Sequence, residues 1–145
     1  MMAIRTVPKP PDAPLLELLR AAGGVVRDLE AACQEHGLTH DQYNVLRILR
    51  GAQPHGHPRG EIGARLLSRA PDVTRMLDRL VRRGLVARGW HAENRRLSIA
   101  TITPAGLALL RACDHGVQRV HARHAQALSA TELKSLQQIC RKLGP

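Results

Sequence analysis

The segment "TRMLDRLVRRGLV", which runs from Thr74 to Val86, constrains the fold of this chain more than any other stretch. With about 100° of rotation per residue, a helix here has one apolar face and one basic face. The apolar face contains Val73, Met76, Leu77, Leu80 and Val81, and the basic face contains Arg75, Arg79, Arg82 and Arg83. Such a helix can pack its apolar face on a core and leave its arginines free for an anionic partner.

The composition favours helices that pack on helices. The chain has 145 residues, enough for one domain, and contains one Trp, one Tyr and no Phe, so its core must be built from Leu, Val, Ile and Ala. Apolar spacing predicts helices at about 15–37, 39–50, 61–67, 71–83, 104–127 and 129–143, with a loop at 51–60 and a β-hairpin at 85–102. The predicted order is α-α-α-α-β-β-α-α. Four prolines in residues 1–14 predict an extended N-terminal arm.

Capping patterns mark several of the predicted helix starts. The stretches "THDQ" at 39–42 and "SATE" at 129–132 fit a capping box. Thr103 followed by Pro104 fits an N-cap with proline at the first helical position, and Pro71 suits the first turn of the fourth helix in the same way.

The positive charge is concentrated in the middle of the chain. The formal net charge is +10, but residues 1–58 balance six basic with six acidic groups, whereas residues 59–96 hold ten arginines and four acids. This distribution indicates a localised anion-binding surface.

The N-terminus lacks a signal-peptide pattern, no apolar run approaches the roughly 20 residues of a membrane span, and the three cysteines lack the spacing of a metal or disulfide framework. We therefore expect a cytoplasmic protein without metal or cofactor.

A short helix, a break, a basic helix and an arginine-tipped hairpin are typical of a winged helix-turn-helix. In this motif, the end of the basic helix nearest the break meets base edges in the major groove of double-stranded DNA. The candidate DNA contacts are Arg69, Asp72, Thr74, Arg75 and Arg79 of the recognition helix, with Arg95 and Arg96 of the wing. Asp72 can accept from a cytosine or favour the helix N-terminus, and the second role is preferred. No catalytic grouping can be placed, so we do not expect an enzyme.

The stretch "LLSRAPDVTRMLDRLVRRGLVARGWHAENRRLSIATITPAGLALL" resembles the recognition helix and wing of the MarR family of bacterial transcription regulators, and "LTHDQYNVLRIL" resembles the family's second helix. The resemblance covers about residues 15–143. It implies a homodimer that represses nearby genes from a pseudo-palindromic operator until a small molecule or oxidant reshapes the dimer. It also implies a helical dimerisation region at 15–37 and 104–145 and a DNA-binding region at 38–103.

Two positions depart from the family pattern in the wing. The family usually has an Asp two residues before the wing arginine, where this chain has Asn94 before Arg96. An asparagine can orient that arginine by a hydrogen bond but not by charge. Trp90 stands at the start of the wing, where packing beneath the hairpin is favoured over contact with the DNA backbone.

The resemblance also implies an effector site, because family members often bind phenolic or other aromatic carboxylates. Tyr43 and Arg47 are the candidates, one to stack on the ring and one to bind the carboxylate; alternatively, Tyr43 is a core residue and Arg47 a surface ion pair. Some relatives sense oxidants through a cysteine, which makes Cys33 a candidate for redox sensing. A winged helix that contacts an acidic protein, without specific DNA binding, is the remaining alternative.

Overall fold

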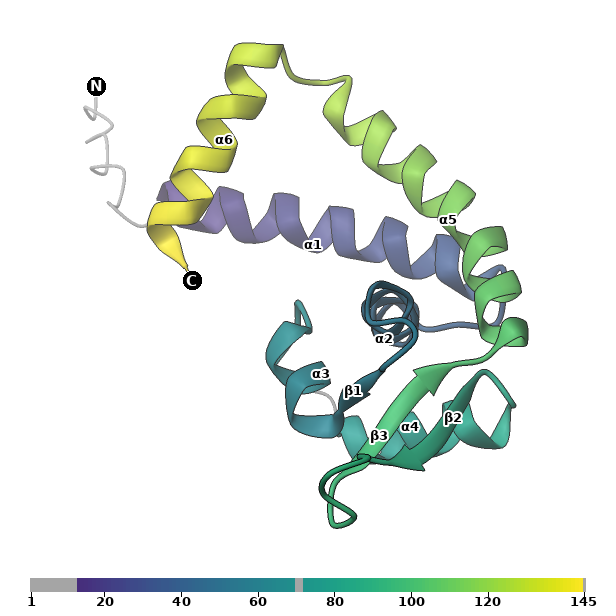
Figure 1. Ribbon diagram of the computed structural model, residues 1–145. Helices are drawn as coiled ribbons and strands as arrows, with labels where there is room; N and C mark the ends of the chain where they lie inside the picture. Colours follow the sequence, from purple (N-terminus) through teal and green to yellow (C-terminus); the bar gives the residue numbers. More distant parts are fainter. Residues whose placement is uncertain (1–12, 70–71, 145) are drawn as a thin grey trace, which may run out of the picture.

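The computed structural model describes residues 13–69 and 72–144. These residues form six helices and three strands (Figure 1). The bounds are α1 Ala13–Gln34, α2 His40–Gly51, β1 His57–Pro58, α3 Arg59–Arg65, α4 Val73–Arg82, β2 Val86–Trp90, β3 Ser98–Ile102, α5 Pro104–Ala125 and α6 Ala130–Leu143. The mainly helical fold with a small β wing is confirmed. The predicted arm lies outside the described residues, except that Ala13 and Pro14 already belong to α1.

The predicted loop at 51–60 is wrong at its C-terminal end. His57 and Pro58 form strand β1, and Arg59 begins α3 two residues before the predicted start. β1 pairs antiparallel with β3, and the sheet order is β1-β3-β2. A strand of two residues has no periodicity to detect, and its proline is tolerated because β1 is an edge strand that need not donate a second ladder hydrogen bond.

Most predicted helix starts are confirmed by their caps. The Thr39 side chain accepts from the backbone N–H of Gln42 at 3.0 Å, while the Gln42 side chain accepts from the Thr39 N–H at 3.0 Å. Ser129 forms the same reciprocal pair with Glu132. α4 begins at Val73 rather than at residue 71, and Pro71 lies outside the described residues.

The start of α5 is tied to the turn between α4 and β2. The Thr103 hydroxyl donates to the Gly84 carbonyl at 2.7 Å and accepts from the Gly106 N–H at 3.0 Å, so it also caps α5. Gly84 has φ +71, the left-handed conformation that ends α4. A Cβ at Gly106 would overlap the Leu85 carbonyl oxygen. This close backbone contact fixes α5 relative to α4 and the β2–β3 hairpin.

The core lies between the C-terminal third of α1, the helices α2 to α4, the sheet and the first two thirds of α5. Its fully or almost fully buried members include Cys33, Leu38, Val45, Leu46, Leu49, Ile62, Leu77, Leu80, Leu110 and Cys113. The aliphatic core expected from the composition is therefore present, with Tyr43 as its one aromatic residue among the described positions.

The N-terminal half of α1 and all of α6 lie outside this core. In Figure 1, α1, α5 and α6 form three sides of a triangle on the side of the molecule away from α4 and the sheet. No residue of α6 is buried. The exposed apolar side chains of these two helices are Leu15, Leu16, Leu19, Val26, Leu133, Leu136, Ile139 and Leu143. We call this set the α1/α6 apolar face.

Candidate nucleic-acid interface

α4 has the two faces predicted from the sequence. Met76, Leu77 and Leu80 are buried against the core. The four arginines of the opposite face, Arg75, Arg79, Arg82 and Arg83, are exposed, as is Arg69 before the helix. α4 and the hairpin lie at the end of the molecule that faces away from α6 (Figure 1). The helix therefore packs its apolar face on the core and exposes its basic face to solvent.

Asp72 is the N-cap of α4. Its carboxylate accepts from the backbone N–H of Arg75 at 3.1 Å and lies 3.8 Å from the Arg75 Nε. The preferred interpretation of Asp72 as a cap is confirmed. The Arg75 side chain keeps 70% of its surface exposed. Since the cap occupies the carboxylate, Arg75 is the more available of the two for a partner at this end of the helix.

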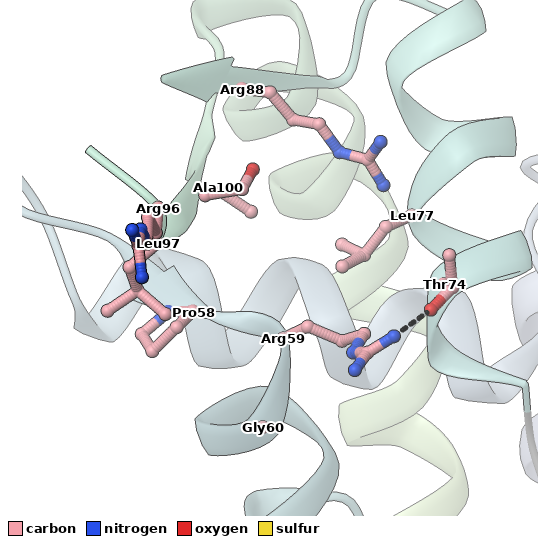
Figure 2. Close-up of a pocket in the computed structure, with 10 residues that line it drawn as sticks. Pro58, Arg59, Gly60, Thr74, Leu77, Arg88, Arg96, Leu97 and Ala100 are labelled. Carbon is pink, nitrogen blue, oxygen red and sulfur yellow. Dashed lines mark hydrogen bonds between the residues drawn. The ribbon is translucent and has the colours of Figure 1, made fainter. Parts of the chain in front are cut away.

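Thr74 lies in the first turn of α4 and is contacted by a residue that the sequence analysis did not single out. Arg59, the first residue of α3, donates from Nη1 to the Thr74 Oγ1 at 2.8 Å (Figure 2). Both residues line a cavity of about 330 Å³ between the start of α3, α4 and the hairpin. Arg88 and Arg96 line the same cavity. The arginine-rich surface of α4 therefore continues onto α3 and the sheet.

One acid of α4 holds the helix to the sheet. Asp78 pairs with Arg88 of β2, with 2.8 Å between the Asp78 Oδ1 and the Arg88 Nη1. At the other end of α4, Arg83 donates to the Gly37 carbonyl at 2.8 Å, so it belongs to the structure of the α1–α2 turn rather than to a freely solvated face. Arg79 and Arg82 make no ion pair with the described residues and remain available to phosphates.

The wing is the turn between β2 and β3, and it carries Arg95 and Arg96 in exposed positions. Asn94 accepts from the backbone N–H of Arg96 at 3.1 Å, so the asparagine orders the turn through the backbone of Arg96 rather than through its guanidinium group. The favoured packing of Trp90 beneath the hairpin is wrong, because Trp90 is 69% exposed. It pairs with Ser98 at the free end of the sheet, beyond the part that β1 extends, and no layer covers it.

The two candidate effector residues lie in different environments. Tyr43 is buried, and its hydroxyl donates to Asp114 Oδ1 of α5 at 2.8 Å. Arg50 donates to the other oxygen of Asp114 at 2.6 Å. Burial, followed by this bond to Asp114, raises the pKa of Tyr43. Arg47 is exposed on α2. The aspartate that links Tyr43 and Arg50 across α2 and α5 carried no signal in the sequence, because nothing local distinguishes it from a surface acid.

Cys33 is completely buried, and so is Cys113. Burial raises the pKa of both thiols, which disfavours the reactive thiolate. Cys140 is exposed on α6.

No three His, Cys, Asp or Glu side chains in residues 13–69 and 72–144 are grouped to hold a metal ion. Over the same residues, no helix has the length and apolar character to cross a membrane.

Two comparisons decide the family. The model of the MarR family matches residues 38–98. A MarR transcription factor from Planctomyces limnophilus is 34% identical, with a TM-score of 0.71 over 94% of this chain and 98% of that one. The chain belongs to the MarR family. Its relatives are transcriptional regulators, and the mainly helical fold with a three-stranded antiparallel sheet is the winged-helix fold of that family.

Other solved MarR-family structures align over almost the whole chain. A mutant MarR from E. coli, solved with operator DNA, is 27% identical, with a TM-score of 0.79 over 92% of this chain and 95% of that one. BpsR of Bordetella bronchiseptica, whose DNA binding is regulated by 6-hydroxynicotinic acid, is 24% identical, with a TM-score of 0.80 over 94% and 97%. The second likeness is one of fold alone. No curated protein matches the chain.

Proposed function

We propose that this MarR-family chain is a homodimeric repressor that binds a pseudo-palindromic operator in double-stranded DNA. The observation that carries the proposal is the placement of α4. Its apolar face is buried, its first turn is open around Arg75, and exposed arginines continue along it and in the wing. A helix that fits the major groove and a wing that reaches the flanking backbone or minor groove account for both basic surfaces. The operator-bound E. coli relative supports the same role.

The proposed contacts divide by chemistry. Arg75 and Thr74 lie at the end of α4 that approaches base edges, and an arginine can donate two hydrogen bonds to guanine O6 and N7. Arg69 and Arg79, with Arg95 and Arg96 of the wing, are proposed to contact phosphates, which fix position without reading sequence. Asp72 serves DNA binding indirectly, by capping the helix that carries Arg75.

The α1/α6 apolar face supports the proposed homodimer. α6 has 14 residues and buries none of them, and an isolated helix of that length is marginal in water. A second copy of the chain would cover this face symmetrically and present two recognition helices. Residues 15–37 and 104–145 are thus proposed as the dimerisation region and 38–103 as the DNA-binding region.

We further propose an aromatic carboxylate as the effector. The likeness to BpsR, which responds to 6-hydroxynicotinic acid, supports this chemical class. Exposed Arg47 is the candidate for the carboxylate. Tyr43 is the candidate for stacking on the ring. Its hydroxyl donates to Asp114, so an effector that accepts a hydrogen bond from this hydroxyl would replace a bond between α2 and α5. Such a replacement would connect effector binding to the helices that flank the DNA-binding region.

Selection of bound fragments from a random duplex library tests the proposed function. We expect a pseudo-palindrome whose half-sites are about one helical turn apart. If the dimer neutralises about eight phosphates, log affinity should fall with a slope near −7 against log salt concentration. Weak binding without sequence preference would instead favour a winged helix that docks on an acidic protein.

A further inference from the structure

We propose that Arg59 determines what the recognition helix reads at one base pair, although it lies on α3 rather than on α4. It does so by fixing the hydrogen-bonding role of Thr74. Arg59 is thus a positioning residue for sequence recognition. The inference rests on the proposed function, because it concerns how the operator is read.

The hydrogen bond between the two side chains has only one possible direction. The Arg59 Nη1 lies 2.8 Å from the Thr74 Oγ1. A guanidinium group has five N–H donors and no acceptor, so the threonine oxygen must accept. The Thr74 hydroxyl then has its own proton left to donate. Because its oxygen accepts from a cation, the hydroxyl becomes a better donor and a poorer acceptor.

The position of Arg59 is set by the fold. Arg59 follows directly on β1, which is held to β3 by antiparallel pairing, and it begins α3. Arg88 lies across the same cavity from Arg59 (Figure 2). Arg88 is paired with Asp78 of α4. Arg59 makes no ion pair with an acid among residues 13–69 and 72–144. Its charge is therefore free to act on Thr74.

The consequence for DNA is a preference for an acceptor opposite Thr74. In the major groove, guanine offers O6 and N7, adenine offers N7 and thymine offers O4, whereas cytosine offers only an amino donor. We infer that one position in each half-site, next to the base pair read by Arg75, favours a base with an acceptor in reach and disfavours cytosine. Without Arg59, the Thr74 hydroxyl can donate or accept, and this preference should weaken.

The test compares operators selected by the full-length protein and its variants. Arg59→Ala and Thr74→Val should each reduce discrimination at the same position by about fivefold, the value of one hydrogen bond. The double variant should lose no more than either single variant, because both changes remove the same interaction. Thr74→Ser, which keeps the hydroxyl, should retain the preference. Arg82→Ala, a matched loss of one exposed charge, should weaken binding to all sequences evenly.

Several outcomes would overturn the inference. Additive losses in the double variant would show that Arg59 does not act through Thr74. If Arg59→Ala weakened binding to all DNA sequences equally, as expected for Arg82→Ala, Arg59 would be a phosphate contact. A coupled loss without any change in base preference would place the Thr74 hydroxyl on a phosphate. In all three cases the wild-type protein still selects an operator, whereas failure of the wild type to select any sequence would reject the proposed function itself. Thermal unfolding of each variant establishes that the fold is kept.

Discussion

α4 and α6 are both amphipathic, yet the fold treats their apolar faces in opposite ways. In α4, Met76, Leu77 and Leu80 are buried by the rest of the chain. In α6, Leu136 and its apolar neighbours remain exposed, and no residue of the helix is buried. An amphipathic pattern therefore indicates that the apolar face of a helix is to be covered, but it does not indicate which surface covers it. The described residues of the chain cover the apolar face of α4 but leave that of α6 exposed.

The largest effect should come from a charge placed in the α1/α6 apolar face. We expect Leu136→Asp to weaken the proposed dimer by about thirtyfold or more, the effect of a central apolar contact in an interface, and to reduce operator binding with it. Sedimentation as a function of concentration measures the change. Gln138→Asp, on the opposite side of α6, is the matched control and should leave the dimer unaffected. If the two variants had the same dimer affinity, the exposed apolar face of α6 would not be an interface, and α6 would not differ from α4 in the way described above.

The outer face of α4 should show a different kind of loss. We expect Arg75→Ala to cost about 1–3 kcal/mol of discrimination at one base pair, because its fork can recognise guanine. Arg96→Ala in the wing should weaken binding to all sequences and reduce the magnitude of the salt slope by about one. Titrations of operator and mutated duplexes at several salt concentrations separate these effects. Both variants should remain dimeric, and an even loss from both would refute the division between base and phosphate contacts.

The link between the two regions can be tested at Gly106. A side chain there overlaps the Leu85 carbonyl, so we expect Gly106→Ala to destabilise the protein by about 1–3 kcal/mol. Denaturant unfolding measures the change. Gly51→Ala is the control, since a Cβ at Gly51 meets nothing within 4 Å and should stabilise α2 by at most about 1 kcal/mol. A neutral result at Gly106 would mean that the start of α5 can move away from the α4–β2 turn.

The smallest expected effect concerns His40, beside the core. Burial holds the pKa of His40 below its ordinary value of 6.5. The unfolded chain therefore takes up a proton before the folded one, so stability is complete above pH 6.5 and falls as the pH is lowered through that range. Unfolding by urea at pH 7.5 and 5.0 measures the loss. His40→Gln should reduce this pH dependence. A steeper dependence in His40→Gln would show the opposite sign.

The features that could be predicted from the sequence are those that depend on residues close together in the chain. The caps at Thr39, Thr103 and Ser129 and the two faces of α4 are local patterns, and the structure confirms them. Trp90 was misplaced because burial depends on which layer lies over a strand end. Strand β1 escaped prediction because two residues have no period. The DNA contacts and the effector residues stay predictions, for which the structure provides positions and neighbours.

Periodicity and charge alone determined that this chain builds a basic amphipathic helix followed by a hairpin, because both properties repeat over distances of a few residues. Only the tertiary structure decided that Arg59 reaches Thr74, that Asp78 holds Arg88, and that Asp114 joins Tyr43. The residues of each pair are separated by 10 to 71 positions, and no local pattern relates them. Their contact depends on how α3, the sheet and α5 pack around a shared core.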